Sequence, residues 1–394
     1  MGNRISLLIG IKNNLKYTKN FYYTTRLLYP EVEIVVVSYG SEDGTHEWLQ
    51  TLDKDQFVKY FFSPDSLTLS DTYNKCIRLA TRPYVAFVHN DMVIGKGFLE
   101  SLEYHLKEDK VLFYKVIEPP VFADDHREWK EVRPFGFDID SFNKDGFASL
   151  NDEIFSRSYG KSEIARSGSF FLCASKKVLA NIGGLDPLFN PMFREDDDLL
   201  IRLNLLNLKM YLVPSAITYH FVSRTSRFSE EYKNVTNEIE QRSDRNFIRK
   251  WGFSASSPVR KKYDVGLVIE NAALELIREV EPYCSRLYVD CDTTAYISQE
   301  QPCTPFLLSK RIRPIADEKD HDILVFMNGQ VRPKRNIEII HRMNELIWEI
   351  AQRKPGLLFR KLGFKKNHFR VRNLSIKVRS FNSLEDQLIY RAEG

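Results

Sequence analysis

The chain has 394 residues, a formal net charge of +4, 43% hydrophobic residues and 13% aromatic residues. These values indicate a folded globular protein and exclude a disordered chain or one that needs a polyanionic partner to balance its charge. The length exceeds what one hydrophobic core usually requires, so two or three domains are expected.

The five cysteines form no CxxC pair, which favours reduced core thiols over a disulfide framework or a zinc site. The N-terminal sequence MGNRISLLIGIKNN has an apolar stretch that is too short for a secretory signal or a membrane span. MGNRIS fits the myristoylation pattern, but the apolar stretch also reads as a buried first strand. We therefore expect a cytoplasmic protein, with peripheral attachment to a membrane surface as an additional option.

Strands and helices alternate over the first hundred residues. Short apolar runs predict strands at 4–11, 32–38, 57–62 and 84–89, and helical spacing predicts helices at 15–29, 45–52 and 69–81. Continuous apolar strands separated by helices indicate an α/β fold with a parallel sheet covered on both faces. In such sheets ligands bind outside the carboxyl ends of the strands.

Residues 117–165 are rich in Pro, Asp, Gly and aromatic residues and show weak periodicity, so we expect an irregular functional loop or lid. Regular structure resumes at 167–186 and continues through an acidic helix, a strand at 210–221 and a helix at 229–250.

A polar segment with a proline and a charge run follows and predicts a domain boundary. We expect a first domain at 1–252, a linker at 253–262 and a smaller α/β domain of unknown role at 263–394. The second domain is expected to contain strands at 263–270, 286–292 and 321–329 and a helix at 335–352.

Two strand ends in the first domain carry candidate ligand-binding residues. In FVHNDM (87–92), Asp91 follows a strand, where a carboxylate either holds Mg²⁺ or Mn²⁺ against a diphosphate or simply closes an Asn-Asp turn. In VVVSYGSEDGTHEWL (35–49), the turn after the strand either meets a nucleotide or is a loop capped by Thr45 or Asp43.

The stretch FREDDDLLIRL (193–203) places four adjacent carboxylates before a leucine-rich run. A helix dipole stabilises each acid in the first turn by about 0.3–1 kcal/mol, which explains one or two of them but not four. Further along, His220 ends the strand of VPSAITYHF, either as a second metal ligand or as a polar strand tip.

In this order and spacing, these features resemble the family 2 nucleotide-sugar glycosyltransferases with the GT-A fold, over residues 4–252. VVVSYGSEDGT is similar to the family's V-V-D-D-G-S-T-D-G-T, and HND stands at its Asp-x-Asp metal motif. GSFFLCASKKVLANIGGLDPLF resembles the acceptor-side segment ending in G-G-[FL]-D-x-x-F. EDDDLLIRL matches E-D-x-D-L-x-x-R, and VPSAITYH matches P-x-A-x-x-x-H.

The resemblance implies a role for each matching residue. Asp91 would bind a divalent metal, Mn²⁺ or Mg²⁺, with His220 and His89 as further ligands. Asp196 would be the general base, and Glu195 and Asp198 would shape and anchor it. The implied donor-binding residues are Ile11, Asn13, Ser38, Tyr39, Asp43, Asn74, Asn90 and Asp91.

Two positions depart from the family pattern. Ser38 and Tyr39 stand where the family has paired Asp residues, so a nucleoside contact is missing or is made by another group, for example by stacking on Tyr39. His89 replaces the first Asp of Asp-x-Asp, so metal binding would be weaker or shared with His220. The departures motivate a second hypothesis, an inactive scaffold that binds a glycan or a nucleotide sugar.

The resemblance implies a metal-assisted, inverting transfer of a sugar from a nucleotide-sugar donor to a hydroxyl of a glycan or lipid-linked glycan acceptor. Residues 353–379 contain ten Lys or Arg and no Asp or Glu, with apolar residues between them. This segment is either a membrane-surface contact near the acceptor or an ordinary basic face of the second domain. No nucleic-acid-binding motif is present, so no nucleic-acid partner is expected.

Overall fold

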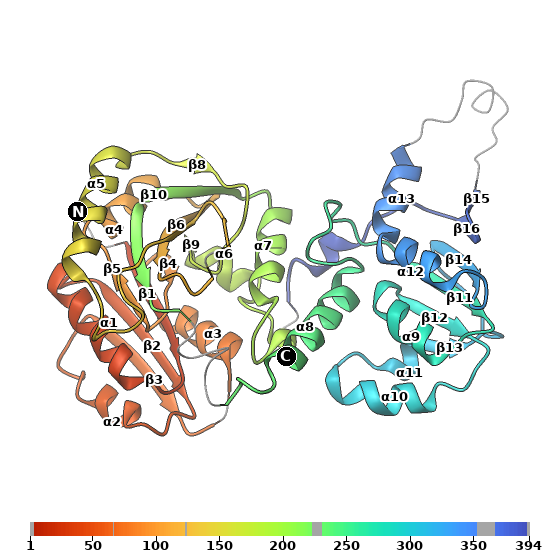
Figure 1. Ribbon diagram of the computed structural model, residues 1–394, viewed down its shortest axis with the longest axis horizontal. Coiled ribbons are helices and arrows are strands. Elements are labelled where there is room, and N and C mark those ends of the chain that lie inside the picture. The colour runs from red at the N-terminus through yellow and green to blue at the C-terminus, as the bar shows by residue number, and fades with distance from the viewer. Residues whose placement is uncertain (1–3, 66, 123, 223–230, 353–366, 392–394) are drawn as a thin grey trace. The chain divides into compact units, whose positions relative to one another are not determined.

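The computed structural model describes residues 4–65, 67–122, 124–222, 231–352 and 367–391. The chain forms two compact units, which Figure 1 shows with their labelled elements. Unit 1 comprises residues 1–237 together with 390–394, and unit 2 comprises residues 238–389.

Unit 1 is built on a mixed, mostly parallel sheet with the strand order β3-β2-β1-β4-β9-β6-β10-β5. Its strands are β1 (Ile5–Ile11), β2 (Glu33–Tyr39), β3 (Val58–Ser63), β4 (Tyr84–Phe87), β5 (Met92–Ile94), β6 (Lys110–Glu118), β9 (Leu172–Ser175) and β10 (Lys209–His220). The short strands β7 (Lys130–Val132) and β8 (Glu163–Ile164) pair with β6 and β10. Strand β9 is antiparallel to both β4 and β6, so β1, β4, β6 and β10 all end at one edge.

Seven helices accompany this sheet in the described part of unit 1. They are α1 (Leu15–Leu28), α2 (Thr45–Gln50), α3 (Leu69–Leu79), α4 (Phe98–His105), α5 (Lys144–Ser158), α6 (Lys176–Asn181) and α7 (Glu195–Leu205). Helix α3 contacts β1 and β2, while α4 and α5 contact β10. Tyr73, Cys76 and Ile77 form the buried side of α3, as helical spacing predicts. The predicted α/β class is therefore confirmed, and β1–β4 lie within one or two residues of their expected positions.

The expectation of a long irregular segment at 117–165 is wrong, because this stretch contains β7, β8 and the 15-residue helix α5. Phe147, Asn151 and Ile154 are buried on one side of α5. The helix begins at Asn143, whose side chain accepts a hydrogen bond from the backbone N–H of Gly146 at 2.9 Å. The prolines and most of the aspartates lie in the segment before this helix and obscured its periodicity.

Unit 2 is a second α/β unit with the strand order β13-β12-β11-β14-β16-β15. Its strands are β11 (Val265–Glu270), β12 (Arg286–Val289), β13 (Ile312–Pro314), β14 (Ile323–Asn328), β15 (His368–Val371) and β16 (Leu374–Val378). Its helices are α8 (Thr236–Trp251), α9 (Leu274–Val280), α10 (Thr294–Glu300), α11 (Leu308–Arg311), α12 (Pro333–His341) and α13 (Met343–Gln352). Strands β11 to β14 pair in parallel and β16 is antiparallel to β14. The single helix expected at 335–352 is thus two helices, α12 and α13.

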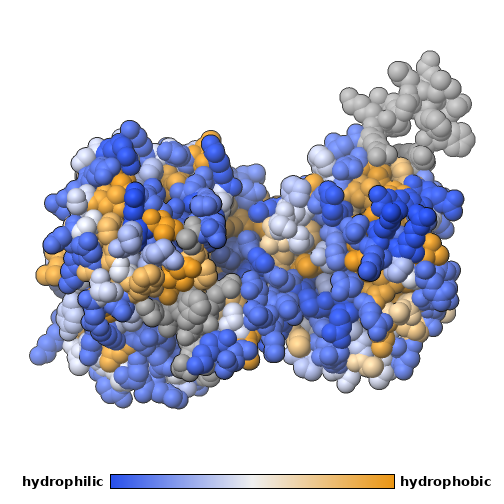
Figure 2. Space-filling view, in the orientation of Figure 1, coloured by the Kyte–Doolittle hydropathy of each residue, from blue (hydrophilic) through white to orange (hydrophobic). Residues whose placement is uncertain are grey.

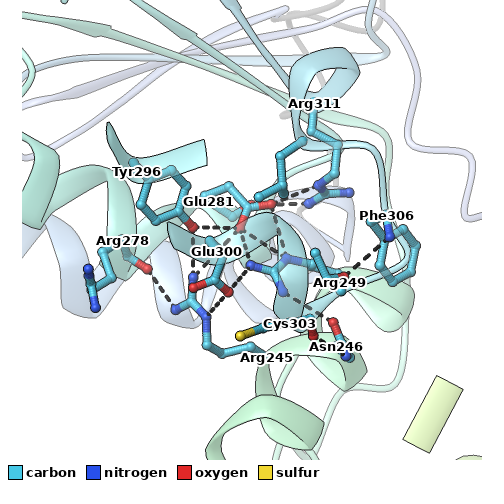
Figure 3. Close-up of polar contacts among 12 residues, drawn as sticks. Arg245, Asn246, Arg249, Arg278, Glu281, Tyr296, Glu300, Cys303, Phe306 and Arg311 are labelled. Atoms are coloured by element: carbon cyan, nitrogen blue, oxygen red, sulfur yellow. Dashed lines mark hydrogen bonds and ion pairs between the residues drawn. The ribbon is translucent and has the colours of Figure 1, made fainter. Parts of the chain in front are cut away.

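The boundary between the units lies earlier than the expected residue 252, because α8 is tied to unit 2 by buried charges. Figure 3 shows that Arg249 of α8 meets Glu281, with 2.7 Å between Nη2 and Oε2. Arg311 reaches the other oxygen of Glu281 at 2.8 Å, and Arg245 pairs with Glu300 at 2.7 Å. Burial opposes ionisation of Glu281, but Arg311 and Arg249 together lower its pKa to about 2.

The expected linker at 253–262 has no helix or strand, yet it packs against unit 2. Ser257 is buried and accepts a hydrogen bond from the side-chain amide of Asn344 at 3.1 Å. At the other end of unit 2, the chain returns to unit 1. The backbone N–H of Arg391 donates to the carbonyl of Ile182 at 3.2 Å.

Among the described residues, no helix combines the length and the hydrophobicity that a bilayer crossing requires. On the face shown in Figure 2, hydrophilic residues surround scattered hydrophobic patches on both units. The predicted membrane contact falls mainly on residues 353–366, which lie outside the described residues. Of the remaining basic residues, Lys377 lies over the ring of Phe326 and Arg379 pairs with Asp320.

We expect Glu281→Gln to destabilise unit 2 by about 3–5 kcal/mol, since it removes the buried carboxylate between Arg249 and Arg311 and leaves Arg249 only its pair with Glu300. Hydrogen exchange at the amides of β11 measures this loss. The control is Asp317→Asn, which breaks a partly exposed pair with Arg313 and should change stability by about 0–1 kcal/mol. Equal exchange rates in the two variants would show that Glu281 does not hold the unit together.

Candidate functional site

Two histidines and an aspartate meet at the carboxyl edge of the unit 1 sheet. His89 and Asp91 follow β4, and His220 ends β10. Nε2 of His220 lies 3.3 Å from Oδ1 of Asp91 and 3.5 Å from Nδ1 of His89. The backbone N–H of Phe221 donates to the carbonyl of Asp91 at 2.9 Å, so the two chain segments are held together beside these side chains.

The three residues form a candidate metal site. Their possible ligand atoms lie within 4.8 Å of one another, and Asp91 and His220 are buried while His89 is partly exposed. Two imidazoles and one carboxylate fit a divalent transition ion, because such ions accept nitrogen as well as oxygen ligands. The structure therefore brings together the three predicted metal ligands, Asp91, His220 and His89.

The protonation of the two histidines differs because their neighbours differ. Burial opposes the charge of His220, but Asp91 and Glu118 outweigh it and raise its pKa to about 10. Burial and the nearby charge of His220 lower the pKa of His89 to about 4. A positive charge is therefore stabilised at the position between Asp91 and Glu118.

A cavity of about 220 Å³ opens beside the metal candidates. It is lined by Gly10, Ile11, Lys12, Leu67, Thr68, Leu69, Thr72, His89, Asp91, Phe170, Pro191, Met192, Phe193, Glu195, His220 and Tyr232. The lining joins residues after β1, around the start of α3, after β4, and at the start of α7. One side carries the metal candidates and another carries a carboxylate of the acidic stretch.

The four carboxylates at the start of α7 have different surroundings. Glu195 is buried and lines the cavity, and within the described part of the chain its Oε2 has no hydrogen-bond partner. Asp196 is partly exposed and does not line the cavity. Asp197 pairs with Arg194 at 2.9 Å. Burial and mutual repulsion raise the pKa of Glu195 well above its ordinary range and the pKa of Asp196 to about 6.

Asp198 has a structural position instead. Its Oδ2 lies 2.8 Å from Nε of Arg202, and both side chains are fully buried. Arg202 also donates to the carbonyls of Ile182 at 2.9 Å and Gly184 at 2.6 Å. Asp198 thus anchors the loop at 182–184 to α7 through Arg202, whereas the resemblance had implied that it anchors Asp196.

Among the predicted donor-binding residues, only Ile11 and Asp91 line the cavity. Asn13 and Asp43 instead join two loops: Asn13 Oδ1 accepts from the N–H of Glu42, and Asp43 accepts from the N–H of Leu15. These two side chains hold together the loops at the edge of the sheet. Neither of them lines the cavity.

The other predicted donor contacts are also engaged within the protein. The hydroxyl of Ser38 lies 2.7 Å from that of Ser41 and 3.0 Å from Nε2 of His46. Tyr39 is buried with its ring 5.8 Å from that of Phe61.

Asn74 and Asn90 hold neighbouring loops and helices. Asn74 exchanges hydrogen bonds of 2.8 Å with both the N–H and the carbonyl of Leu185. Asn90 donates to the hydroxyl of Thr18 at 3.0 Å. The sequence could not show that both amides are already used within the protein.

Two charged residues of the site were missed by the sequence analysis. Glu118 ends β6 and contacts His220, and Lys12 lines the cavity and pairs with Glu231 at 2.9 Å. Glu118 carries the same signal that identified Asp91, a carboxylate at the end of an apolar strand. Lys12 stands directly after β1 but resembled an ordinary surface lysine.

Part of unit 1 matches a known protein family. Residues 6–167 match the model of the glycosyl transferase family 2. The match covers β1 to β4 with His89 and Asp91, and it ends before α7 and His220. The resemblance expected from the sequence is thus confirmed over residues 6–167, and this match supports a glycosyltransferase.

Solved structures with a similar chain course include GalNAc-T7 with UDP, GalNAc and Mn²⁺, with a TM-score of 0.41 and 11% identity, covering 55% of this chain and 42% of that one. Another is the mannosyltransferase PcManGT from Pyrobaculum calidifontis in complex with GDP-Man and Mn²⁺, with a TM-score of 0.39 and 13% identity, covering 62% and 61%. The chain spans less than two thirds of either protein. No curated protein sequence matches the chain.

Substitutions in α7 should separate anchoring from catalysis. We expect Asp198→Asn to destabilise unit 1 by about 3–5 kcal/mol, because buried Arg202 loses its counter-charge. Asp196→Asn should leave stability equal or higher. The folded state raises the pKa of Asp196, so the ionised group opposes folding above pH 6 and a neutral amide removes that penalty. Differential scanning calorimetry at pH 7.5 measures the stability of both variants. A loss of stability in both would contradict the separation of an anchoring Asp198 from a catalytic Asp196.

Proposed function

We propose that unit 1 transfers a sugar from a nucleotide-sugar donor to a hydroxyl of a glycan or lipid-linked glycan, with inversion at the anomeric carbon. The observation that carries this proposal is the single cavity lined by His89, Asp91 and His220 and by Glu195 of α7. It lies in a unit that matches a glycosyltransferase family. Donor and acceptor groups held in one cavity react as a near-unimolecular pair.

His89, Asp91 and His220 would hold a divalent cation. When bound, such a cation supplies positive charge that stabilises a departing nucleoside diphosphate. The two imidazoles favour Mn²⁺ over Mg²⁺, because Mg²⁺ prefers oxygen ligands. The side chain of Lys12, which also lines the cavity, is a further cation for the phosphates.

The carboxylates at the start of α7 would remove the proton of the acceptor hydroxyl. Asp196, the base predicted from sequence, has a pKa near 6, which suits a base at neutral pH. Burial and the charge of Asp196 raise the pKa of Glu195 well above its ordinary range, which favours its protonated form, and in that form it would donate a hydrogen bond to a substrate oxygen. Because Glu195 rather than Asp196 lines the cavity, it is the competing candidate for the base.

A thermal-shift panel of nucleotide sugars tests the donor and the metal together, since a ligand that binds the native state raises the melting temperature. We expect a shift with one nucleotide sugar that requires Mn²⁺ and is lost in Asp91→Ala. A shift in Asp91→Ala as large as in the wild type would place the cation elsewhere. Donor binding without any transfer to acceptors would favour the inactive scaffold.

Paired variants test the base. Asp196→Asn should lower kcat by roughly 10²–10⁴-fold, the usual contribution of a general base, with little change in donor affinity. Asp109→Asn, an exposed acid of the same unit, is the matched control and should keep full activity. If Glu195→Gln shows the larger loss and Asp196→Asn keeps its rate, Glu195 is the base.

The pH profile of kcat gives an independent check. A base with a pKa near 6 must be ionised, so the rate should fall as pH drops through about 6. Repulsion from Asp197 contributes to this raised pKa. Asp197→Asn should therefore move the acidic limb to lower pH, and an unmoved limb would exclude Asp196 as the titrating group.

A further inference from the structure

A buried ion pair lies directly behind His220. Glu118 ends β6, and its Oε1 is 2.9 Å from Nδ1 of His220. The other oxygen, Oε2, is 2.9 Å from Nζ of Lys130 on β7. The three side chains are at most 8% exposed, so water has little access to these contacts.

The contact with Glu118 determines which nitrogen of His220 carries a proton. The other oxygen of Glu118 faces the ammonium of Lys130, so this side chain is a carboxylate and can only accept. The proton of a neutral imidazole therefore sits on Nδ1. The lone pair is then on Nε2, the nitrogen that faces Asp91 at 3.3 Å and His89 at 3.5 Å.

Lys130 holds Glu118 in this orientation. Its ammonium also lies 3.2 Å from Oδ2 of Asp125 and 3.2 Å from the carbonyl of Phe122. With one oxygen fixed by Lys130, Glu118 can offer His220 only the other. Without an acceptor at this place, the imidazole could turn its Nδ1 toward the cavity.

We propose that Glu118, fixed by Lys130, is a positioning residue that sets the tautomer and orientation of His220 for a divalent cation. The proposal rests on the cation site of the proposed function. Carboxylates that accept from a ligating histidine commonly contribute 10–100-fold to metal affinity by this means. A purely structural ion pair would contribute to folding but not to the cation.

Unit 2 contains a matched pair that serves as the control. His321 Nδ1 lies 2.8 Å from Oδ1 of Asp264, and its Nε2 lies 3.0 Å from the hydroxyl of Tyr288. Both nitrogens of that imidazole are thus bound by protein groups. The carboxylate–imidazole contact is the same as at Glu118, but in His321 no nitrogen is left for a cation.

Titration of Mn²⁺ followed by electron paramagnetic resonance tests the proposal without using activity. Glu118→Leu should weaken Mn²⁺ binding by about 10–100-fold and change the spectrum of the bound ion. Glu118→Gln retains an acceptor for Nδ1–H and should keep most of the affinity. Asp264→Leu removes the matched pair of unit 2 and should bind Mn²⁺ as the wild type does.

The outcomes separate this inference from the proposed function. Wild-type Mn²⁺ affinity in folded Glu118→Leu, with binding lost in Asp91→Ala, overturns the role of Glu118 and keeps the cation site. Absence of Mn²⁺ binding in the wild type overturns both. If Glu118→Leu does not fold, ¹⁵N NMR of the Mg²⁺-loaded wild type decides: a proton on Nδ1 of His220 supports the proposal, and a proton on Nε2 overturns it.

Discussion

The site of unit 1 depends on one imidazole held between two buried carboxylates. His220 lies 3.3 Å from Asp91 and 2.9 Å from Glu118, at the edge where four strands end. Two carboxylates out of water require positive charge nearby, and burial makes that requirement stronger. The edge is therefore built to hold positive charge, as a protonated imidazole when no metal is bound and, in the proposed function, as a divalent ion bound by the neutral imidazole. Lys12 extends this positive character into the cavity.

Adjacent carboxylates in the acidic stretch of α7 have opposite effects on the stability of the fold. Asp198 is neutralised by Arg202 and fixes the loop at 182–184, which stabilises the fold. Within the described residues Glu195 and Asp196 have no buried ion pair of this kind, and their raised pKa values, which the nearby charge of Arg194 only partly offsets, record the cost of placing them there. Groups kept at a cost to stability commonly occur at functional sites. The loop that Arg202 holds is also bound by Asn74 and Arg391, so it is fixed from three sides.

Unit 2 has its own hydrophobic core and its own buried charge cluster around Glu281. The match to a known family ends at residue 167 and does not reach it. Its four parallel strands and covering helices give it an α/β architecture like that of unit 1. Helix α8 is part of this unit through Arg249, although its polar sequence resembled the last helix of the preceding domain.

The sequence by itself determined the α/β class and the strands β1–β4, and its family resemblance grouped Asp91, His220 and Glu195 in one site. The class and the strands follow from local patterns, because apolar runs bury strands and parallel strands end at a common edge. Helix α5 escaped notice, because prolines and aspartates in the segment before it masked its spacing. The tertiary structure alone decided that Glu118 stands behind His220, that Asn74 and Ser38 are engaged within the protein, and that α8 belongs to unit 2. Each of these depends on which side chains from distant segments meet, and strand register and helix packing set that only when the whole chain folds.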